Sequence, residues 1–312
     1  MIQSRILPVL ILPLAWIHAA PTRTRPENCL ADVIRADTPL LMRRATTNWS
    51  YEGAQGPAHW GILSSNTCAT GRFQSPVDFE GDTFAVSKGP DVSGWGDLLA
   101  SFSVKNTGRV VQLQVNESQP PLWTGVPAEG WDGMDSYRVQ NLHFHSPGEH
   151  HVDGKYFPLE AHIVQSSGAG KISIIGLFFD LGPSNLWFDQ FLPQVPIHAN
   201  TSTKIQGLEL QPLIAHLQTS SYFHYTGSLT MPPCTEDVAW FVAREPLTVS
   251  DSQLAVLRGA VPYNARPTQE NASAAFKRML HWTRQQFVDG VRSLTEASKA
   301  RPRRSWRAKK QP

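Results

Sequence analysis

The feature that most constrains this chain is a succession of short β-forming runs between turn formers, which begins near Trp49. Strands are predicted over residues 100–104, 110–115, 137–145, 159–165, 171–179 and 238–243. Several of these runs are apolar on both faces, which is typical of strands buried on both sides of a sheet. With 24 Pro and 22 Gly among 312 residues, turns are frequent. Only two helices are predicted, over residues 184–191 and 276–294.

The first twenty residues differ from the rest of the chain. Arg5 precedes an apolar run over residues 6–17, and small residues follow at positions 19 and 20. This order is that of a secretory signal peptide, and the run is too short to span a bilayer convincingly. No later stretch reaches about 18 uninterrupted apolar residues. We therefore expect a secreted, extracellular protein without a transmembrane segment.

Residues 21–44 are rich in Arg, Thr and Pro and show little periodicity. The pair Arg43-Arg44 before the small residue Ala45 has the form of a dibasic processing site, which would make 21–44 a propeptide. An ordinary charged linker explains the segment equally well, and both interpretations stay open.

Charge is divided unevenly along the chain. Residues 45–298 hold 15 basic and 23 acidic residues, whereas the stretch from Lys299 to the end holds seven Lys or Arg and no acid. A basic tail is able to bind nucleic acid or an anionic surface. Because the body is acidic and no nucleic-acid motif is present, we interpret the tail as a solvated segment and expect no nucleic-acid partner.

The cysteines and glycosylation sequons agree with secretion. In an oxidising compartment, Cys29, Cys68 and Cys234 favour one disulfide with one cysteine left over, and three pairings are permitted. Four Asn-X-Ser/Thr sequons predict glycosylation. Their asparagines are Asn48, Asn116, Asn200 and Asn271.

A group of histidines carries the chemistry. His143 and His145 stand two positions apart in one predicted strand, so both imidazoles point to the same side. His162 lies in the next predicted strand, and the turn formers between the two runs allow a return strand beside the first. Three imidazoles on adjacent strands suit a tetrahedral zinc ion with its fourth position open to water. The connecting stretch also holds His150 and His151, and two interpretations stay open for them: competing ligands or ordinary turn residues.

Five motifs occur in an order that points to a family. One is His-Phe-His followed by Gly-Glu-His and Leu-Glu-Ala-His, and the others contain Gly-Pro-Ala-His-Trp, Gln-Ser-Pro-Val-Asp, Leu-Thr-Met-Pro-Pro-Cys and Asn-Ala-Arg-Pro-Thr-Gln. They occupy residues 142–162, 51–60, 74–78, 228–234 and 264–269. Together they resemble the alpha-type carbonic anhydrases, in particular secreted members of eukaryotic type.

The resemblance implies a fold and a division of the chain. We expect a mixed, mainly β domain over residues 45–278. It would contain a large central, mostly antiparallel twisted sheet of about ten strands, a few short peripheral helices, and zinc in a conical cleft. A C-terminal helix and basic tail over residues 279–312 lie outside the resemblance.

The resemblance also implies an activity. The chain would be a carbonate dehydratase that reversibly hydrates carbon dioxide to bicarbonate and a proton with a hydroxide on zinc. Thr230 would accept a hydrogen bond from this hydroxide and donate one to Glu149, and its backbone amide would meet a substrate oxygen. Sulfonamides and anions are the expected inhibitors. The implied zinc ligands are His143, His145 and His162.

Other positions take supporting roles by the same resemblance. Glu160 would accept the second imidazole proton of His162 and fix its tautomer. Asn141 stands in the corresponding place before His143, where the family more often has Gln, and the shorter amide puts that hydrogen bond in question. Tyr51 is expected in the same supporting layer.

Carbon dioxide has no net dipole, so its site should be apolar. Cys68 and Cys234 match cysteines that are bridged in secreted members, and this disulfide would tether loop 229–234 to the N-terminal region. The substrate-binding positions implied by the resemblance are Val164, Ile174, Leu229, Thr230, Met231 and Trp240.

Two positions depart from the family. Fast members transfer protons through a histidine at the position of Arg109, and arginine cannot relay protons near neutral pH. We therefore expect turnover to be limited by proton transfer and accelerated by imidazole buffers. Met231 stands where many members have Thr or His, and a bulky apolar residue there is expected to weaken bicarbonate binding and alter inhibitor preference.

Two rival functions fit the sequence less well. Catalytically silent binding modules share the fold but typically lack one or more zinc histidines, and all three are present here. A zinc hydrolase acting on esters would use the same hydroxide, but the sequence contains nothing that resembles a dedicated ester pocket or a nucleophilic Ser elbow.

Overall fold

The computed structural model describes residues 49–63, 66–86, 88–96, 100–116, 122–127, 133–272, 274–280 and 286. The predicted signal peptide, the segment 21–44, Cys29, Asn48 and most of the predicted C-terminal helix and tail lie outside these residues and stay predictions. In the part of the chain that is described, no helix has the length and apolar character to cross a membrane.

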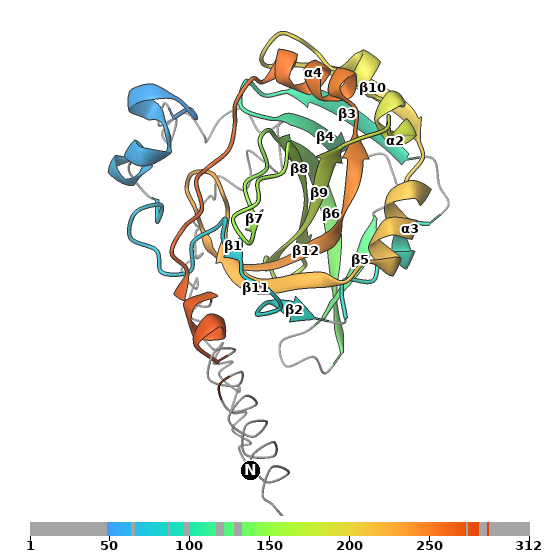
Figure 1. The fold of residues 1–312 in the computed structure, drawn as a ribbon. Coiled ribbons are helices and arrows are strands. Elements are labelled where there is room, and N and C mark those ends of the chain that lie inside the picture. The colour runs from blue at the N-terminus through green and yellow to red at the C-terminus, as the bar shows by residue number, and fades with distance from the viewer. Residues whose placement is uncertain are drawn as a thin grey trace, which may run out of the picture.

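A ten-stranded twisted sheet forms the centre of the molecule (Figure 1). Its strand order is β10-β3-β4-β6-β8-β9-β12-β11-β2, and β5 pairs with β6. The neighbours are antiparallel except β9 and β12, which are parallel. The strands are β2 (Ala85–Val86), β3 (Ala100–Asn106), β4 (Val111–Val115), β5 (Trp123–Pro127), β6 (Met134–His145), β8 (Leu159–Ser167), β9 (Ile172–Leu181), β10 (Thr201–Leu208), β11 (Tyr222–Ser228) and β12 (Glu236–Val249).

This architecture confirms the expected mainly β, mostly antiparallel fold. Each of the six predicted strands lies within or overlaps an observed one. Strands β2, β5, β10 and β11 of this sheet were not predicted from the sequence. A separate two-stranded parallel sheet joins β1 (Asp78–Phe79) to β7 (His151–Val152).

Short helices lie around the sheet. The predicted helix 184–191 is present but shorter, since Asn185 caps it and it ends at Asp189. Two helices were not predicted, although α4 begins with a capping box in which Ser250 and Gln253 each bond the other's backbone. The α-helices are α2 (Leu186–Asp189), α3 (Gln211–Thr219) and α4 (Asp251–Ala260), and the 3₁₀ turns are η2 (Gly53–Gln55), η3 (Pro57–Ile62), η4 (Ser93–Trp95) and η6 (Leu192–Gln194).

The two faces of the sheet bury different residues. Leu142 and Phe144 of β6 belong to a large apolar cluster that includes buried residues of α2, α3 and α4. Because strand side chains alternate, His143 and His145 point to the other face. There a second apolar cluster contains Val164, Ile174 and Trp240. One face therefore stabilises the fold against its helices, and the other carries the predicted site.

Candidate metal centre

The three predicted zinc ligands come together on two neighbouring strands. His143 of β6 is the direct cross-strand partner of His162 of β8, and His145 lies opposite Glu160. The triad is buried, with 3%, 0% and 1% of His143, His145 and His162 exposed. One ring nitrogen from each lies within 4.8 Å of the others, as a common metal ion requires.

Each imidazole of the triad is oriented by an acceptor on its other nitrogen. Nδ1 of His143 lies 2.9 Å from Oδ1 of Asn141, so the hydrogen bond that the shorter amide put in question is formed. Nδ1 of His145 donates to the carbonyl of Asn264 at 2.7 Å. Nε2 of His162 donates to Oε1 of Glu160 at 2.7 Å. A neutral imidazole that donates through one nitrogen presents a lone pair on the other, which is the form that binds a metal.

The free nitrogens of the triad fit a metal ion. Among the described residues, Nε2 of His145 is buried and has no hydrogen-bond partner. Burial and the neighbouring His162 lower the pKa of His145 to about 3, even though the Asn264 carbonyl opposes them. Burial likewise lowers the pKa of His143 and of His162. Within the described part of the chain this group consists of three histidines, and three neutral imidazoles match the donor set of catalytic zinc sites.

Glu160 holds a network behind the triad. Its Oε1 also accepts from Nδ1 of His150 at 2.7 Å, and its Oε2 accepts the backbone amides of Glu149 and His150 at 2.7 and 2.8 Å. Burial raises the pKa of Glu160, but His150 and His162 outweigh burial and hold it well below the usual value. Nε2 of His150 lies 2.7 Å from the hydroxyl of Tyr225. Both nitrogens of His150 are therefore engaged, so it supports the triad rather than acting as a turn residue or a ligand.

Glu149 and Thr230, which we call the loop pair, lie on irregular segments beside the triad. Glu149 is 1% and Thr230 is 3% exposed. Oε1 of Glu149 accepts the backbone amide of Arg266 at 2.8 Å, while Oε2 has no partner with hydrogen-bond geometry among the described residues. Burial raises the pKa of Glu149 well above its usual value, and hydrogen bonding from the Thr230 side chain and the Arg266 amide opposes that shift. Thr230 is thus close enough to act on this carboxyl.

The predicted apolar wall is assembled next to the triad. Val164 pairs with Ile174 across β8 and β9, and Ile174 pairs with Trp240 across β9 and β12. Leu229 belongs to the same buried cluster. The ring of Trp240 lies 4.8 Å from that of His162, with the two planes at 77°. These contacts form an apolar surface beside one of the histidines.

Met231 and Tyr51 lie in a different buried cluster, with Trp49 and Trp60. The ring of Tyr51 is 6.5 Å from that of His145. Its hydroxyl is buried and has no partner among the described residues. Burial, reinforced by Glu149, raises the pKa of Tyr51 well above the usual value. Tyr51 therefore stays a neutral group close to the triad.

Arg109 is attached to Trp49. Its Nε donates to the carbonyl of Trp49 at 3.1 Å, and its guanidinium carbon lies 4.3 Å from the centre of the Trp49 ring. This geometry is that of a cation–π contact combined with a hydrogen bond. The position that the resemblance assigns to a proton-transferring histidine therefore holds a charge that is engaged with the N-terminal part of the domain.

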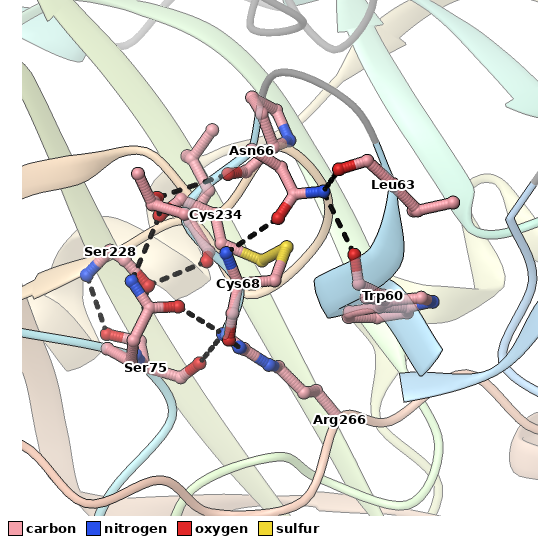
Figure 2. The surroundings of a disulfide bond; sticks show 12 residues. Trp60, Leu63, Asn66, Cys68, Ser75, Ser228, Cys234 and Arg266 are labelled. Atoms are coloured by element: carbon pink, nitrogen blue, oxygen red, sulfur yellow. Dashed lines mark hydrogen bonds between the residues drawn. A yellow bond between two sulfur atoms is a disulfide. The ribbon is translucent and has the colours of Figure 1, made fainter. Parts of the chain in front are cut away.

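Figure 2 shows the disulfide between Cys68 and Cys234, the pairing implied by the resemblance. Around it, Thr67 Oγ1 donates to the carbonyl of Cys234 at 2.6 Å, and Nη2 of Arg266 donates to the carbonyl of Cys68 at 2.9 Å. The sequence analysis did not identify Asn264, Arg266, His150 or Tyr225 as parts of the site. Asn264 and Arg266 lie within the motif over residues 264–269, which was the available signal.

The structure disagrees with one predicted glycosylation site. Asn271 is 1% exposed, and its Nδ2 donates to the carbonyls of Gln74 and Thr226. A glycan on that nitrogen is incompatible with this packing. Asn200 is exposed in a turn, and Asn116 is half-buried with Oδ1 accepting from Ser103. Glycosylation of Asn48, Asn116 and Asn200 stays a prediction.

Comparison with known proteins gives one consistent result. Residues 55–286 match the eukaryotic-type carbonic anhydrase family. A carbonic anhydrase of Pectobacterium atrosepticum is 32% identical over 229 residues, which is 72% of this chain and 88% of that protein.

Solved structures agree. The alpha-carbonic anhydrase of Thermovibrio ammonificans, in complex with the inhibitor sulfanilamide, has a TM-score of 0.63 and 32% identity, covering 72% of this chain and 96% of that one. The alpha-carbonic anhydrase of Aspergillus oryzae has a TM-score of 0.60 and 31% identity, covering 72% and 94%. The chain therefore belongs to the eukaryotic-type carbonic anhydrases, zinc lyases that hydrate carbon dioxide.

Proposed function

We propose that this carbonic anhydrase binds zinc through Nε2 of His143, Nε2 of His145 and Nδ1 of His162. The observation that carries the proposal is the arrangement of the triad. Each imidazole gives its other nitrogen to an acceptor, and Nε2 of His145 is a buried atom without a partner among the described residues. Imidazole donors in this number favour zinc over calcium or magnesium, which prefer oxygen ligands.

Zinc supplies Lewis acidity that brings the pKa of coordinated water to about 7, a value for which carbonic anhydrase is itself the standard example. The protein residues then decide orientation. The Thr230 hydroxyl donates to the Glu149 carboxyl, whose pKa its hydrogen bonding lowers, and this donation leaves a Thr230 lone pair free to face the triad. The Thr230 amide meets a substrate oxygen. Carbon dioxide rests against the apolar surface formed by Val164, Leu229 and Trp240.

Proton transfer limits this enzyme, because Arg109 stands at the shuttle position. A guanidinium stays protonated near neutral pH and has no acceptor site for a proton. Arg109 also points its charge at Trp49. In unbuffered water the proton must leave a group of pKa about 7 directly to solvent. Its release rate is the acid dissociation constant multiplied by the diffusion-limited rate constant of recombination. Turnover therefore cannot exceed about 10³ s⁻¹.

Stopped-flow hydration of carbon dioxide tests both parts of the proposal. The zinc-loaded chain should hydrate carbon dioxide, and turnover should rise with imidazole concentration. R109H should raise turnover at low buffer, whereas R109Q, which also disturbs the contact with Trp49 but cannot carry protons, should not. Zinc-bound protein without hydration contradicts the assignment of the site. Unbuffered turnover far above about 10³ s⁻¹ contradicts the proton-transfer limit alone.

Secretion and inhibitor binding are further parts of the proposal. Residues 1–20 support export, and a disulfide between Cys68 and Cys234 suits an oxidising compartment. Intact mass of the exported protein tests cleavage after residue 20 and after Arg44, and the mass after glycosidase treatment tests the sequons. Because the Thermovibrio relative is solved with sulfanilamide, we expect sulfonamides and anions to inhibit this chain, with Met231 shifting their order of affinity.

A further inference from the structure

The segment that contains Asn264 and Arg266 has no regular secondary structure, yet it makes two contacts with the site. The carbonyl of Asn264 accepts from His145, and the amide of Arg266 donates to Glu149. The segment has no ladder or helix to hold it, and only isolated backbone bonds, such as those from Asn264 to Ser146 and from Gln269 to Pro76, so its side chains contribute much of what fixes its position. Asn264 is held from the sheet side: Nδ2 donates to the carbonyls of Phe144 and Arg109, and Oδ1 accepts the amide of Ser146.

Arg266 is held from a different part of the molecule. Its side chain is buried, with 3% of the residue exposed. Nη1 donates to Oε1 of Gln74 at 3.0 Å and to the carbonyl of Ser75 at 2.7 Å, and Nη2 donates to the carbonyl of Cys68 at 2.9 Å (Figure 2). The planar guanidinium binds three acceptors of one segment in a fixed geometry. These bonds hold the main chain of residue 266, and with it the direction of the N–H that meets Glu149.

The same segment, residues 67–75, is fastened to the loop that carries Thr230. Cys68 is bonded covalently to Cys234. The amide and hydroxyl of Thr67 donate to the carbonyls of Pro233 and Cys234. The amide of Ser75 donates to Oγ of Ser228 at 2.9 Å. Residues 67–75 therefore hold both members of the loop pair. They contact Glu149 through Arg266, and they are joined to the Thr230 loop by the disulfide and hydrogen bonds.

We propose that Arg266 is a positioning residue for Glu149, and that it transmits to Glu149 the constraint set by the Cys68–Cys234 disulfide. Metal binding does not depend on this path, because His143 and His162 are paired within the sheet and Asn264, which supports His145, is anchored to β6. Loss of the anchor therefore lowers turnover while zinc stays bound. The inference rests on the proposed roles of Glu149 and Thr230.

The experiment measures kcat and kcat/KM for carbon dioxide hydration, with zinc content determined on the same samples. Saturating imidazole removes the proton-transfer limit. R266A should lower kcat/KM roughly ten- to hundredfold, the usual cost of a displacement of about 1 Å in a catalytic group, with zinc unchanged. R266K, which keeps the charge and part of the hydrogen bonding, should recover part of the loss. R244A is the matched control, since that arginine pairs with Asp82 at the surface.

Two double-variant comparisons separate positioning from a general structural role. In an E149Q background, R266A should cost little further activity, because the group that it positions has already been removed. In a C68S/C234S background, which alone should lower kcat/KM, R266A should cost less than in the native chain. If R266A does not fold, R266K and C68S/C234S replace it in the test, and each should lower kcat/KM while zinc stays bound.

Three outcomes overturn the inference. The first is native kcat/KM in R266A. The second is an equal cost of R266A with Glu149 present or replaced. The third is a fall in activity that follows loss of zinc. A native chain that binds zinc but does not hydrate carbon dioxide instead contradicts the proposed function, and this result is seen before any variant is compared.

Discussion

The triad and the loop pair lie side by side but are held in opposite ways. His143 and His162 are neighbours in a strand ladder. Both of their strands, β6 and β8, pair with a strand on each side, so many backbone hydrogen bonds fix the position of each histidine. Glu149 and Thr230 lie on irregular segments, where single contacts decide position. One such contact, from Arg266 to Glu149, joins residues 117 apart in sequence, and another, from Arg266 to Cys68, joins residues 198 apart.

This difference predicts different weaknesses. The ladder is vulnerable to loss of the histidines themselves and to acid, which charges buried imidazoles. The loop pair is vulnerable to loss of its anchor, because few bonds hold it. Metal binding and catalytic orientation should therefore fail separately, under different perturbations.

The largest effect is expected at the triad itself. H162A removes one of three zinc donors, so zinc affinity should fall by more than the roughly 10–100-fold that loss of a supporting hydrogen bond costs. Zinc content after dialysis against a weak chelator measures this. H150Q is the matched control, because His150 supports Glu160 without facing the metal, and its loss should be within that range. Equal zinc loss in the two variants would show that the ligand set is misassigned.

The next effect is on stability and concerns the anchor of the loop pair. The disulfide closes a loop with a sequence separation of 166. C68S/C234S should lower the free energy of unfolding by about 2–5 kcal/mol, because the unfolded chain gains conformational freedom. Urea denaturation of the folded, zinc-loaded protein measures it. Zinc stoichiometry should be unchanged, and loss of zinc in the folded variant would remove the distinction between the two regions.

Acid should weaken the sheet through buried histidines, and His224 of β11 reports this away from the triad. Burial lowers its pKa from 6.5 to about 4, even though the Trp240 carbonyl opposes the shift. As pH falls below 6.5 the unfolded chain is protonated first, so stability present above pH 6.5 is lost towards pH 4. The loss is up to about 3 kcal/mol. H224Q should flatten this part of the stability curve, and parallel curves for the two proteins would contradict the prediction.

The smallest effect concerns the support of a single ligand. N141L removes the acceptor on Nδ1 of His143 and should weaken zinc binding about tenfold. Q140A is the control on the same strand, since Gln140 directs its amide to Arg138 and Ser166 instead. A competition titration with a zinc chelator measures the zinc dissociation constant and resolves a tenfold change. Native affinity in N141L would show that the ladder alone orients His143.

The parts of the site that the sequence predicted share a local signal. His143, His145 and Glu160 stand two positions from a partner on the same strand, and period-two alternation places such pairs on one face. The resemblance added the roles of Glu149 and Thr230, whose segments have no period to interpret. Helices α3 and α4 were missed because each is only nine or ten residues long and shows few turns of helical spacing, although the capping box at Ser250 was visible.

The errors have a common physical origin. From the sequence, His150 was either a competing ligand or a turn residue, but tertiary packing places both its nitrogens in hydrogen bonds with Glu160 and Tyr225. Asn271 was predicted to carry a glycan, but the chain buries it as a donor to Gln74. A sequon or a turn composition describes a few adjacent residues, whereas burial is decided by whatever distant segment packs on them.

The sequence by itself determined the strand-rich fold, the shared face of the triad and the family, because alternation and ordered motifs are properties of neighbouring residues. Only the tertiary structure decided that Asn264 and Arg266 reach the site, that one segment anchors both members of the loop pair, and that Arg109 contacts Trp49. The physical reason is that a backbone ladder repeats every two residues, whereas these bonds join residues 60 to 198 positions apart and exist only once the whole sheet has closed around them.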